Sequence, residues 1–306
     1  MKMQLPIGTE IHYLCKPSYK VLLNENKYID KIWVLQPNLM DTVKEINAQE
    51  FDCIIDLQNN LRTFVIKQFC KVKAYSFNKL NFSKFLLTQF KINRIPSIHI
   101  VDRYFEAVKE LNVCDDGAGM DYFNPTLPAD IYAKTGLNQE INFVAIAIGG
   151  QHSTKKMPFT QLSKLIEQIQ HKIVLLGGKE DAELGKKLEE LNPNKVTNFS
   201  GQLTLHESAG VVALSKAVIT HDTGMMHIAA ALKKPIITLW GNTIPEFGMG
   251  PYYGKHKIFY FNSEVPKLKC RPCHKLGHNQ CPKGHFKCMN LQNIPTICLE
   301  LEKAIG

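Results

Sequence analysis

Long apolar runs are missing from this chain of 306 residues. No run approaches the roughly 18 apolar residues that a membrane-spanning helix needs, which argues against a transmembrane protein. The opening letters MKMQLPIGTE contain no apolar signal segment, so we expect the protein to stay inside the cell. Hydrophobic residues make up 44% and charged residues 21%, which excludes a mainly disordered or collagen-like chain. The length predicts about two domains of roughly 150 residues each.

Carboxylates are absent from two stretches, residues 57–101 and 265–299. The formal net charge is +9, and eight Lys and Arg lie in the first stretch and six in the second. Aromatic residues, among them Phe82, Phe85 and Phe90, are interleaved with the cations of the first stretch. This pattern predicts a cationic face toward an anionic surface or substrate, although a pair of solvated lysine-rich faces with core aromatics would also explain it.

Short apolar runs alternate with helical periods along the chain. The runs lack period-two alternation, which is typical of parallel strands covered on both faces. Helical periods place Phe159, Leu162, Leu165, Ile166 and Ile169 on one face, and Phe105, Val108 and Leu111 on another. The order predicts an α/β fold with parallel sheets. We expect strands at residues 10–14, 31–35, 52–57, 143–148, 172–176, 195–199, 217–220 and 235–239.

A domain boundary is predicted near residues 117–140, where GAGMDYFNPTLPAD breaks the periodicity. We expect two doubly wound, Rossmann-like domains facing a cleft: residues 1–135 and 136–290, followed by a C-terminal helix over 291–306. In such sheets, ligands bind beyond the carboxyl ends of the strands. The loops that follow strands are therefore the places to look for chemistry.

Two post-strand loops of the second half carry glycine pairs. In the first, Gly149 and Gly150 allow close backbone approach and Lys155 brings a positive charge, so the loop can hold phosphate, although a plain turn explains it as well. In the second, a glycine pair precedes Glu180 in the first helical turn. Glu180 can accept a ribose hydroxyl or simply complement the helix dipole.

The third loop carries the strongest signal, with the letters THDTGMMH after a strand. Asp222 or Thr223 is expected to cap a helix whose free amides suit a diphosphate. Gly224 leaves room for a ligand, and His227 shares the helical face of Thr223. A cap with a satisfied histidine is the structural alternative.

These residues carry a resemblance to a known family. The segment HDTGMMHIAAALKKPIITLWGNTIPEFGMGPY closely resembles the corresponding stretch of glycosyltransferase family 9, the ADP-heptose:lipopolysaccharide heptosyltransferases. STKKMP resembles the lysine loop of that family, and CRPCHKLGHNQCPKGHFKCM resembles the cysteine-rich tail of some members. Further similar segments are EIHYLCKPSYKVLLNENKYIDKIWVL, FDCIIDLQNNLRT and HIVDRYFEAVKEL.

The resemblance implies a GT-B fold in which the second domain holds the donor. Asp222, Thr223, Gly224 and His227 would hold the nucleotide diphosphate and sugar, Lys155 would neutralise phosphate charge, and Glu180 would reach the ribose. It implies an inverting transfer of heptose, or a related sugar, from an ADP-sugar to a lipopolysaccharide core or lipid A acceptor. No metal or other cofactor is required. We expect a cytoplasmic protein, peripheral at the inner face of the inner membrane and in contact with its anionic surface, with no nucleic-acid partner.

The chain departs from the family at its start. Family members open with a strand, an R-x-S-x-x-G-D loop whose aspartate is the expected general base, and a helix; this chain begins at the end of that helix. We therefore expect the first domain to lack its first strand. Either the sequence begins upstream, or the domain is rearranged and the chain is an inactive relative that still binds ADP-sugar.

The nine cysteines fall into two groups. Cys15, Cys53, Cys70, Cys114 and Cys298 are scattered in apolar settings and are expected to be core residues. Cys270, Cys273, Cys281 and Cys288 form a cluster that either packs as a reduced loop or holds structural zinc. Zinc and the basic stretches together suit the rival interpretation, a nucleic-acid-binding protein with salt-dependent affinity and no affinity for ADP.

Overall fold

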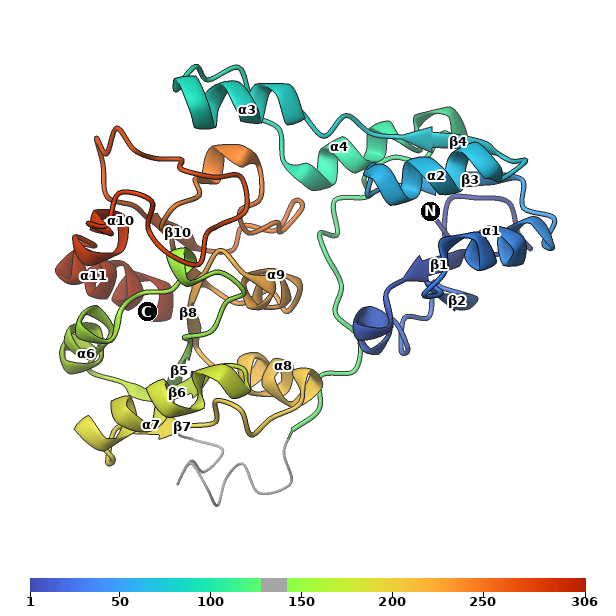
Figure 1. Cartoon of the computed structure of the whole chain (residues 1–306). Coiled ribbons are helices and arrows are strands. Elements are labelled where there is room, and N and C mark those ends of the chain that lie inside the picture. The colour runs from blue at the N-terminus through green and yellow to red at the C-terminus, as the bar shows by residue number, and fades with distance from the viewer. Residues whose placement is uncertain (128–141) are drawn as a thin grey trace. The chain divides into compact units, whose positions relative to one another are not determined.

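The computed structural model describes residues 1–127 and 142–306, which divide into two units (Figure 1). The first unit contains residues 1–80 and 98–116, and the second contains residues 81–97 and the described part of 117–306. Residues 81–97 thus pack with the second unit although their sequence neighbours on both sides belong to the first. The predicted boundary between residues 135 and 136 lies outside the described residues.

The second unit is built on a six-stranded parallel sheet of order β10-β9-β8-β5-β6-β7. The central strands are buried along their whole length, as their continuous apolar sequences predict for strands covered on both faces. This sheet confirms the expected α/β architecture. Its strands are β5 (Phe143–Ala147), β6 (Lys172–Leu176), β7 (Val196–Asn198), β8 (Ala217–His221), β9 (Ile236–Leu239) and β10 (Tyr260–Ser263).

Helices cover both faces of this sheet and form two apolar cores (Figure 1). One core contains buried residues of α6 (Phe159–Gln168), α7 (Ala182–Leu191) and α11 (Ile294–Ile305). The other contains residues of α8 (Leu205–Leu214) and α9 (Gly224–Ala231). The apolar period correctly predicted that Leu162, Leu165 and Ile166 of α6 are buried. Phe159, predicted on the same face, is the first residue of the helix and is 39% exposed.

Two further helices lie in the described part of the second unit. Helix α3 (Asn81–Phe90) lies in residues 81–97, the segment of the second unit that interrupts the sequence of the first unit. Helix α10 (Lys287–Asn290) precedes α11 and carries the buried Cys288. Short 3-10 turns follow several strands: η3 (Ser153–Lys155), η4 (Lys179–Asp181) and η5 (Pro245–Phe247).

The strands of the first unit form two separate parallel pairs, β1 with β2 and β3 with β4. Val43 of α1 and Ile66 of α2 form its small core together with Cys70. The helix expected around Phe105, Val108 and Leu111 is interrupted, because α4 ends at Glu106 and a 3-10 turn follows. The bounds are β1 (His12–Cys15), η1 (Pro17–Leu22), β2 (Lys31–Val34), α1 (Leu39–Asn47), β3 (Cys53–Asp56), α2 (Leu61–Phe69), β4 (Lys73–Ser76), α4 (Ile100–Glu106) and η2 (Lys109–Leu111).

Two strands were not predicted. Both β4, with the sequence KAYS, and β10, with the sequence YFNS, lie at sheet edges and carry exposed polar or aromatic positions. Edge strands need no continuous apolar run, so the pattern used to find the central strands does not detect them.

Candidate active site

The three loops singled out in the sequence meet at the carboxyl edge of the second unit's sheet. Because β5 lies between β6 and β8 in a parallel sheet, the loops that follow these strands are neighbours. A Cβ atom on Gly149 would lie 2.5 Å from Asp181 Oδ2, and one on Gly150 would lie 3.1 Å from Thr223 Cγ2. The first glycine pair therefore lets the β5 loop pack against the loops after β6 and β8.

Lys155 and Asp222 are in direct contact. Lys155 Nζ lies 2.7 Å from Asp222 Oδ2 and also donates to the Asp222 carbonyl at 3.0 Å. Thr243, in the loop after β9, donates its hydroxyl to the same carboxylate oxygen at 2.8 Å. All three side chains are largely buried, so the ion pair has little competition from water. Two residues that lie 67 positions apart in the sequence thus form one ion pair.

A second lysine–carboxylate pair lies beside the first. Lys156 Nζ contacts Asp181 Oδ1 at 2.9 Å, and Asp181 Oδ2 accepts the amide hydrogen of Gly178 at 3.0 Å. Glu180, the residue expected at the ribose, is an exposed residue of η4 beside Gly178, and its contact with a ribose stays a prediction. Neither Lys156 nor Asp181 stood out in the sequence, where the only signal for them was their position next to Lys155 and Glu180.

The lysine loop is fixed to the end of β8 by His221. The fully buried imidazole accepts the amide hydrogen of Met157 at its Nε2 atom, at 2.9 Å. Burial lowers the pKa of His221 to about 4, so the ring is neutral at neutral pH. This histidine belongs to the HDTG motif, but nothing in the sequence pointed to its structural role.

Helix α9 begins without a side-chain cap, which corrects the expectation that Asp222 or Thr223 would cap it. Thr223 occupies the N-cap position but makes no capping hydrogen bond, and the Asp222 carboxylate is turned to Lys155 and Thr243 instead. Apart from its chain neighbours and the backbone of its own helix, no atom of the described residues lies within 4 Å of the place where Gly224 would carry a Cβ, so the start of the helix borders open space. His227 lies half-buried on the same helix. Amides at an uncapped helix start, next to a lysine, are suited to bind a phosphate group.

Arg271, from the cysteine-rich segment, holds the loop that supplies Thr243. Its guanidinium donates to the carbonyl oxygens of Gly241 at 2.5 Å and Thr243 at 2.8 Å, and it pairs with Glu264 at 2.9 Å. Burial raises the pKa of Glu264, and the nearby guanidinium opposes this shift. A cation in this segment is therefore connected through Thr243 to Asp222, an arrangement that no sequence pattern indicated.

All nine cysteines are free thiols. Cys114 is exposed, which corrects its expected place in the core, whereas Cys70 is buried. Burial raises the pKa of the Cys288 thiol to about 11 and also raises that of Cys273. Across residues 1–127 and 142–306, no three His, Cys, Asp or Glu side chains are grouped so that they could hold a metal ion.

None of the helices in residues 1–127 and 142–306 has the length and apolar character needed to cross a membrane.

The fold has close counterparts among solved structures. The glycosyl transferase family 9 structure from Veillonella parvula superimposes with a TM-score of 0.73 at 20% identity, covering 97% of this chain and 88% of that one. The structure of E. coli heptosyltransferase WaaC with ADP gives a TM-score of 0.67 at 18% identity, covering 97% of this chain and 91% of that one. The fold therefore defines an α/β protein of the GT-B type, as expected.

Sequence comparison gives the family. The model of glycosyltransferase family 9 (heptosyltransferase) matches residues 40–278, and the chain belongs to this family. Lipooligosaccharide heptosyltransferase 2 of Haemophilus influenzae is 25% identical over 217 residues, which are 65% of this chain and 63% of that protein. Lipopolysaccharide heptosyltransferase 2 of Escherichia coli is 33% identical over 93 residues, 29% of this chain and 27% of that protein. The chain thus spans about 63% of the length of the first relative and less of the second.

Proposed function

We propose that this protein transfers a heptose, or a related sugar, from an ADP-sugar to an acceptor in the lipopolysaccharide core or lipid A, with inversion at the anomeric carbon. The single observation that carries the proposal is the Lys155–Asp222 pair at the uncapped start of α9, next to open space at Gly224. Membership in family 9 and the heptosyltransferase names of its relatives support the choice of sugar and acceptor.

In the proposed reaction, an acceptor hydroxyl oxygen attacks the anomeric carbon as the bond from that carbon to the diphosphate oxygen breaks. The hydroxyl proton leaves to a general base, and ADP carries away the bonding electron pair. Negative charge therefore grows on the departing diphosphate. The α9 amides and the ammonium group of Lys155 can stabilise this charge more strongly in the transition state than in the bound donor.

Asp222 positions Lys155 in this proposal. Its carboxylate holds the Lys155 ammonium group at 2.7 Å, and the hydrogen bond from Thr243 fixes the carboxylate in turn. Lys156 is held by Asp181 in the same way, so both loop lysines are positioned before a ligand binds. Positioned cations lose less conformational entropy on binding than mobile surface lysines do.

The proposal is tested by titrating the protein with ADP and by measuring turnover of ADP-heptose with a lipopolysaccharide core acceptor. We expect Lys155→Ala to lower turnover by about 100- to 1000-fold, the usual effect of removing one donor to a developing anion. Lys164→Ala, at an exposed position on α6, is the control and should leave turnover unchanged.

The outcomes separate the alternatives. ADP binding without turnover of any acceptor would identify an inactive family member that retains its donor site. Absence of ADP affinity, combined with steeply salt-dependent binding to DNA or RNA, would favour the nucleic-acid-binding interpretation. Wild-type turnover by Lys155→Ala would show that this lysine does not stabilise the departing diphosphate.

We also propose that the protein works in the cytoplasm at the inner face of the inner membrane, without a metal or other cofactor.

A further inference from the structure

Helix α3 exposes a row of large apolar side chains to solvent. Phe82, Phe85 and Phe90 are 70%, 52% and 62% exposed, and Ile92, just beyond the helix, is 46% exposed. The Phe85 and Phe90 rings contact each other edge to face, with their centroids 5.9 Å apart, so they form one continuous apolar surface. Such a cluster on one short helix is unusual for a surface that faces only water.

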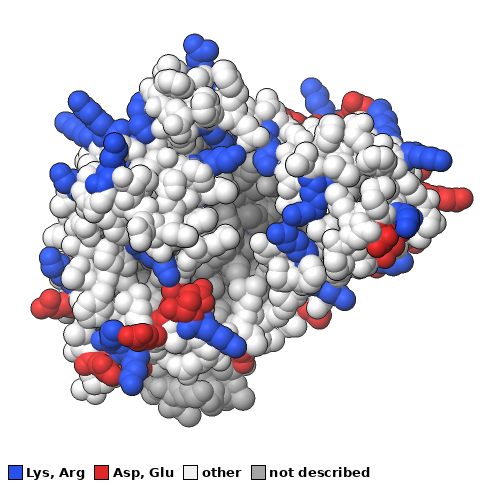
Figure 2. Space-filling view, viewed as in Figure 1, with Lys and Arg blue, Asp and Glu red and all other residues white. Residues whose placement is uncertain are grey.

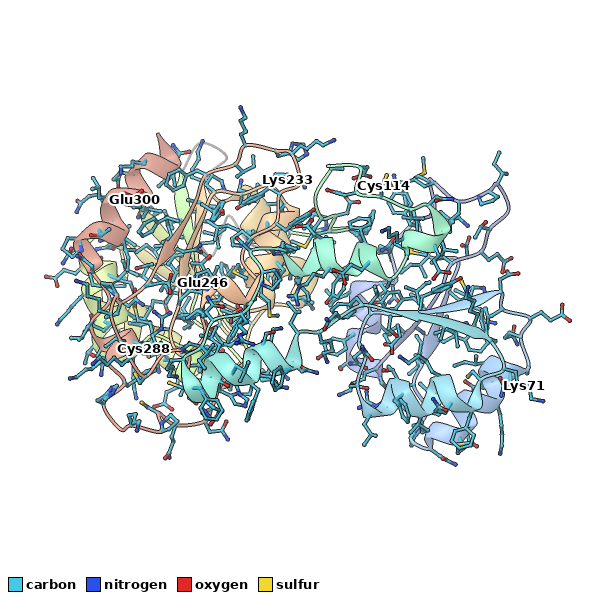
Figure 3. All side chains as sticks on the ribbon, turned by 90° about the horizontal axis from the view of Figure 1, so that it is seen from above. Lys71, Cys114, Lys233, Glu246, Cys288 and Glu300 are labelled. Carbon is cyan, nitrogen blue, oxygen red and sulfur yellow. The ribbon has the colours of Figure 1, made fainter. Side chains whose placement is uncertain are left out.

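The opposite side of α3 attaches to the second unit, which turns the aromatic side outward. Leu87 is buried, and Lys84 Nζ lies 5.9 Å from the ring centroid of Phe247. Just after the helix, Lys91 donates to the carbonyl oxygens of Pro272 at 2.7 Å and Cys270 at 3.3 Å. Figures 1 and 3 show α3 lying beside the second unit, and Figure 3 shows it near the labelled Glu246. The helix is therefore held in place with its phenylalanines pointing away from the body.

The contact between Lys91 and Pro272 joins the two stretches that contain no carboxylate, residues 57–101 and 265–299. Arg94, Lys267 and Lys269 are exposed members of these stretches. On the face seen in Figure 2, the upper part of the second unit carries basic groups, whereas its acidic groups gather lower down. Lys267 and Lys269 line a pocket with Leu87 of α3 and with Glu246 and Glu264, and Glu264 is paired with Arg271, so the surface beside α3 has an excess of cations.

We propose that α3 docks the second unit onto an anionic lipid bilayer. The three phenylalanines enter the boundary between headgroups and acyl chains, while Arg94, Lys267 and Lys269 contact lipid phosphates. The helix carries no carboxylate of its own, and an aromatic helix face bordered by cations is suited to bind an anionic membrane surface. The cations add attraction from outside the helix, which a helix of ten residues needs because its own apolar area is small. This docking extends the proposed function and does not depend on the donor site.

The test uses the full chain and sedimentation with vesicles, either of phosphatidylcholine alone or of phosphatidylcholine mixed with phosphatidylglycerol. We expect binding to the mixed vesicles, weakened by salt, and little binding to the neutral ones. The double variant Phe82→Ser/Phe85→Ser should bind mixed vesicles at least about tenfold more weakly. Arg94→Gln should weaken binding to mixed vesicles and leave the weak neutral binding unchanged.

The control is Leu191→Ser/Leu299→Ser, which removes two similarly exposed apolar side chains, 53% and 58% exposed, from other helices of the same unit. It should bind vesicles like the wild type. Phe85→Trp provides a direct probe, since its fluorescence should shift to the blue when mixed vesicles are added. ADP titration of each variant shows whether the donor site is intact, so a failure of docking is distinguishable from a failure of the proposed function.

The proposal is overturned if the wild type does not bind mixed vesicles or if the phenylalanine double variant binds as well as the wild type. It is also overturned if vesicles leave the emission of the Phe85→Trp variant unchanged while RNA shifts it, because stacking on bases would then be the role of these aromatics.

Discussion

The hydrogen bond from Thr243 to Asp222 allows a sharp test of the site's construction. Replacing Thr243 by valine keeps the shape of the side chain and removes the hydroxyl that donates to Asp222 Oδ2 at 2.8 Å. Thr243 is 1% exposed and Asp222 is buried, so water cannot replace the lost donor without a rearrangement. A bond to a charged acceptor contributes about 1.5–3 kcal/mol, and we expect the free energy of unfolding to fall by this amount.

The second unit offers a matched control. Thr238, on β9, is equally buried, but its hydroxyl has no hydrogen-bond partner among the described residues. Thr238→Val should therefore leave the stability unchanged or raise it slightly, because an unsatisfied polar group is removed from an apolar setting. The two substitutions are chemically identical and differ in the partner of the hydroxyl.

Tryptophan fluorescence reports the outcome for the second unit. The chain has two tryptophans, and Trp240 is fully buried in the second unit. In a Trp33→Phe background, urea unfolding followed at Trp240 should show the midpoint of Thr243→Val lowered by about 0.5–1.5 M. Equal midpoints for Thr243→Val and Thr238→Val would refute the inferred contribution of Thr243 to the Asp222 site.

Two further predictions concern the same edge of the sheet. In the unfolded chain His221 has the ordinary histidine pKa of 6.5, whereas in the folded protein its pKa is about 4. The stability that neutral His221 contributes is therefore fully present above pH 6.5. It is lost as the pH falls toward 4, because only the unfolded chain binds the proton in that range. Lowering the pH from 7 to 5 should cost about 2 kcal/mol in urea unfolding, and His221→Gln should remove that dependence; an unchanged pH slope in the variant would contradict it. Gly149→Ala should lower the free energy of unfolding by about 1–3 kcal/mol, because the new Cβ meets Asp181 at 2.5 Å. Gly224→Ala, which points into open space, should leave stability unchanged but weaken ADP binding in calorimetry if the donor occupies that space, and unaltered ADP affinity would place the donor elsewhere.

The resemblance to family 9 was visible in the sequence and is confirmed by the family match. The α/β fold was also predictable, because central parallel strands need continuous apolar runs that show in any short window. The meeting of the three glycine-containing loops followed from the same reasoning, since loops after neighbouring parallel strands share one edge.

The sequence by itself determined the order of the elements and pointed to the loops that form the candidate site, because propensity and periodicity are local properties. Only the tertiary structure decided which carboxylate holds which lysine. Asp222 has a local preference for capping a helix. In the structure its carboxylate instead contacts Lys155 and Thr243, which lie on two other loops. Arg271 reached the site through backbone carbonyls, which carry no residue-specific signal. Pairings of this kind depend on strand order and side-chain direction, and these are fixed when the sheet assembles.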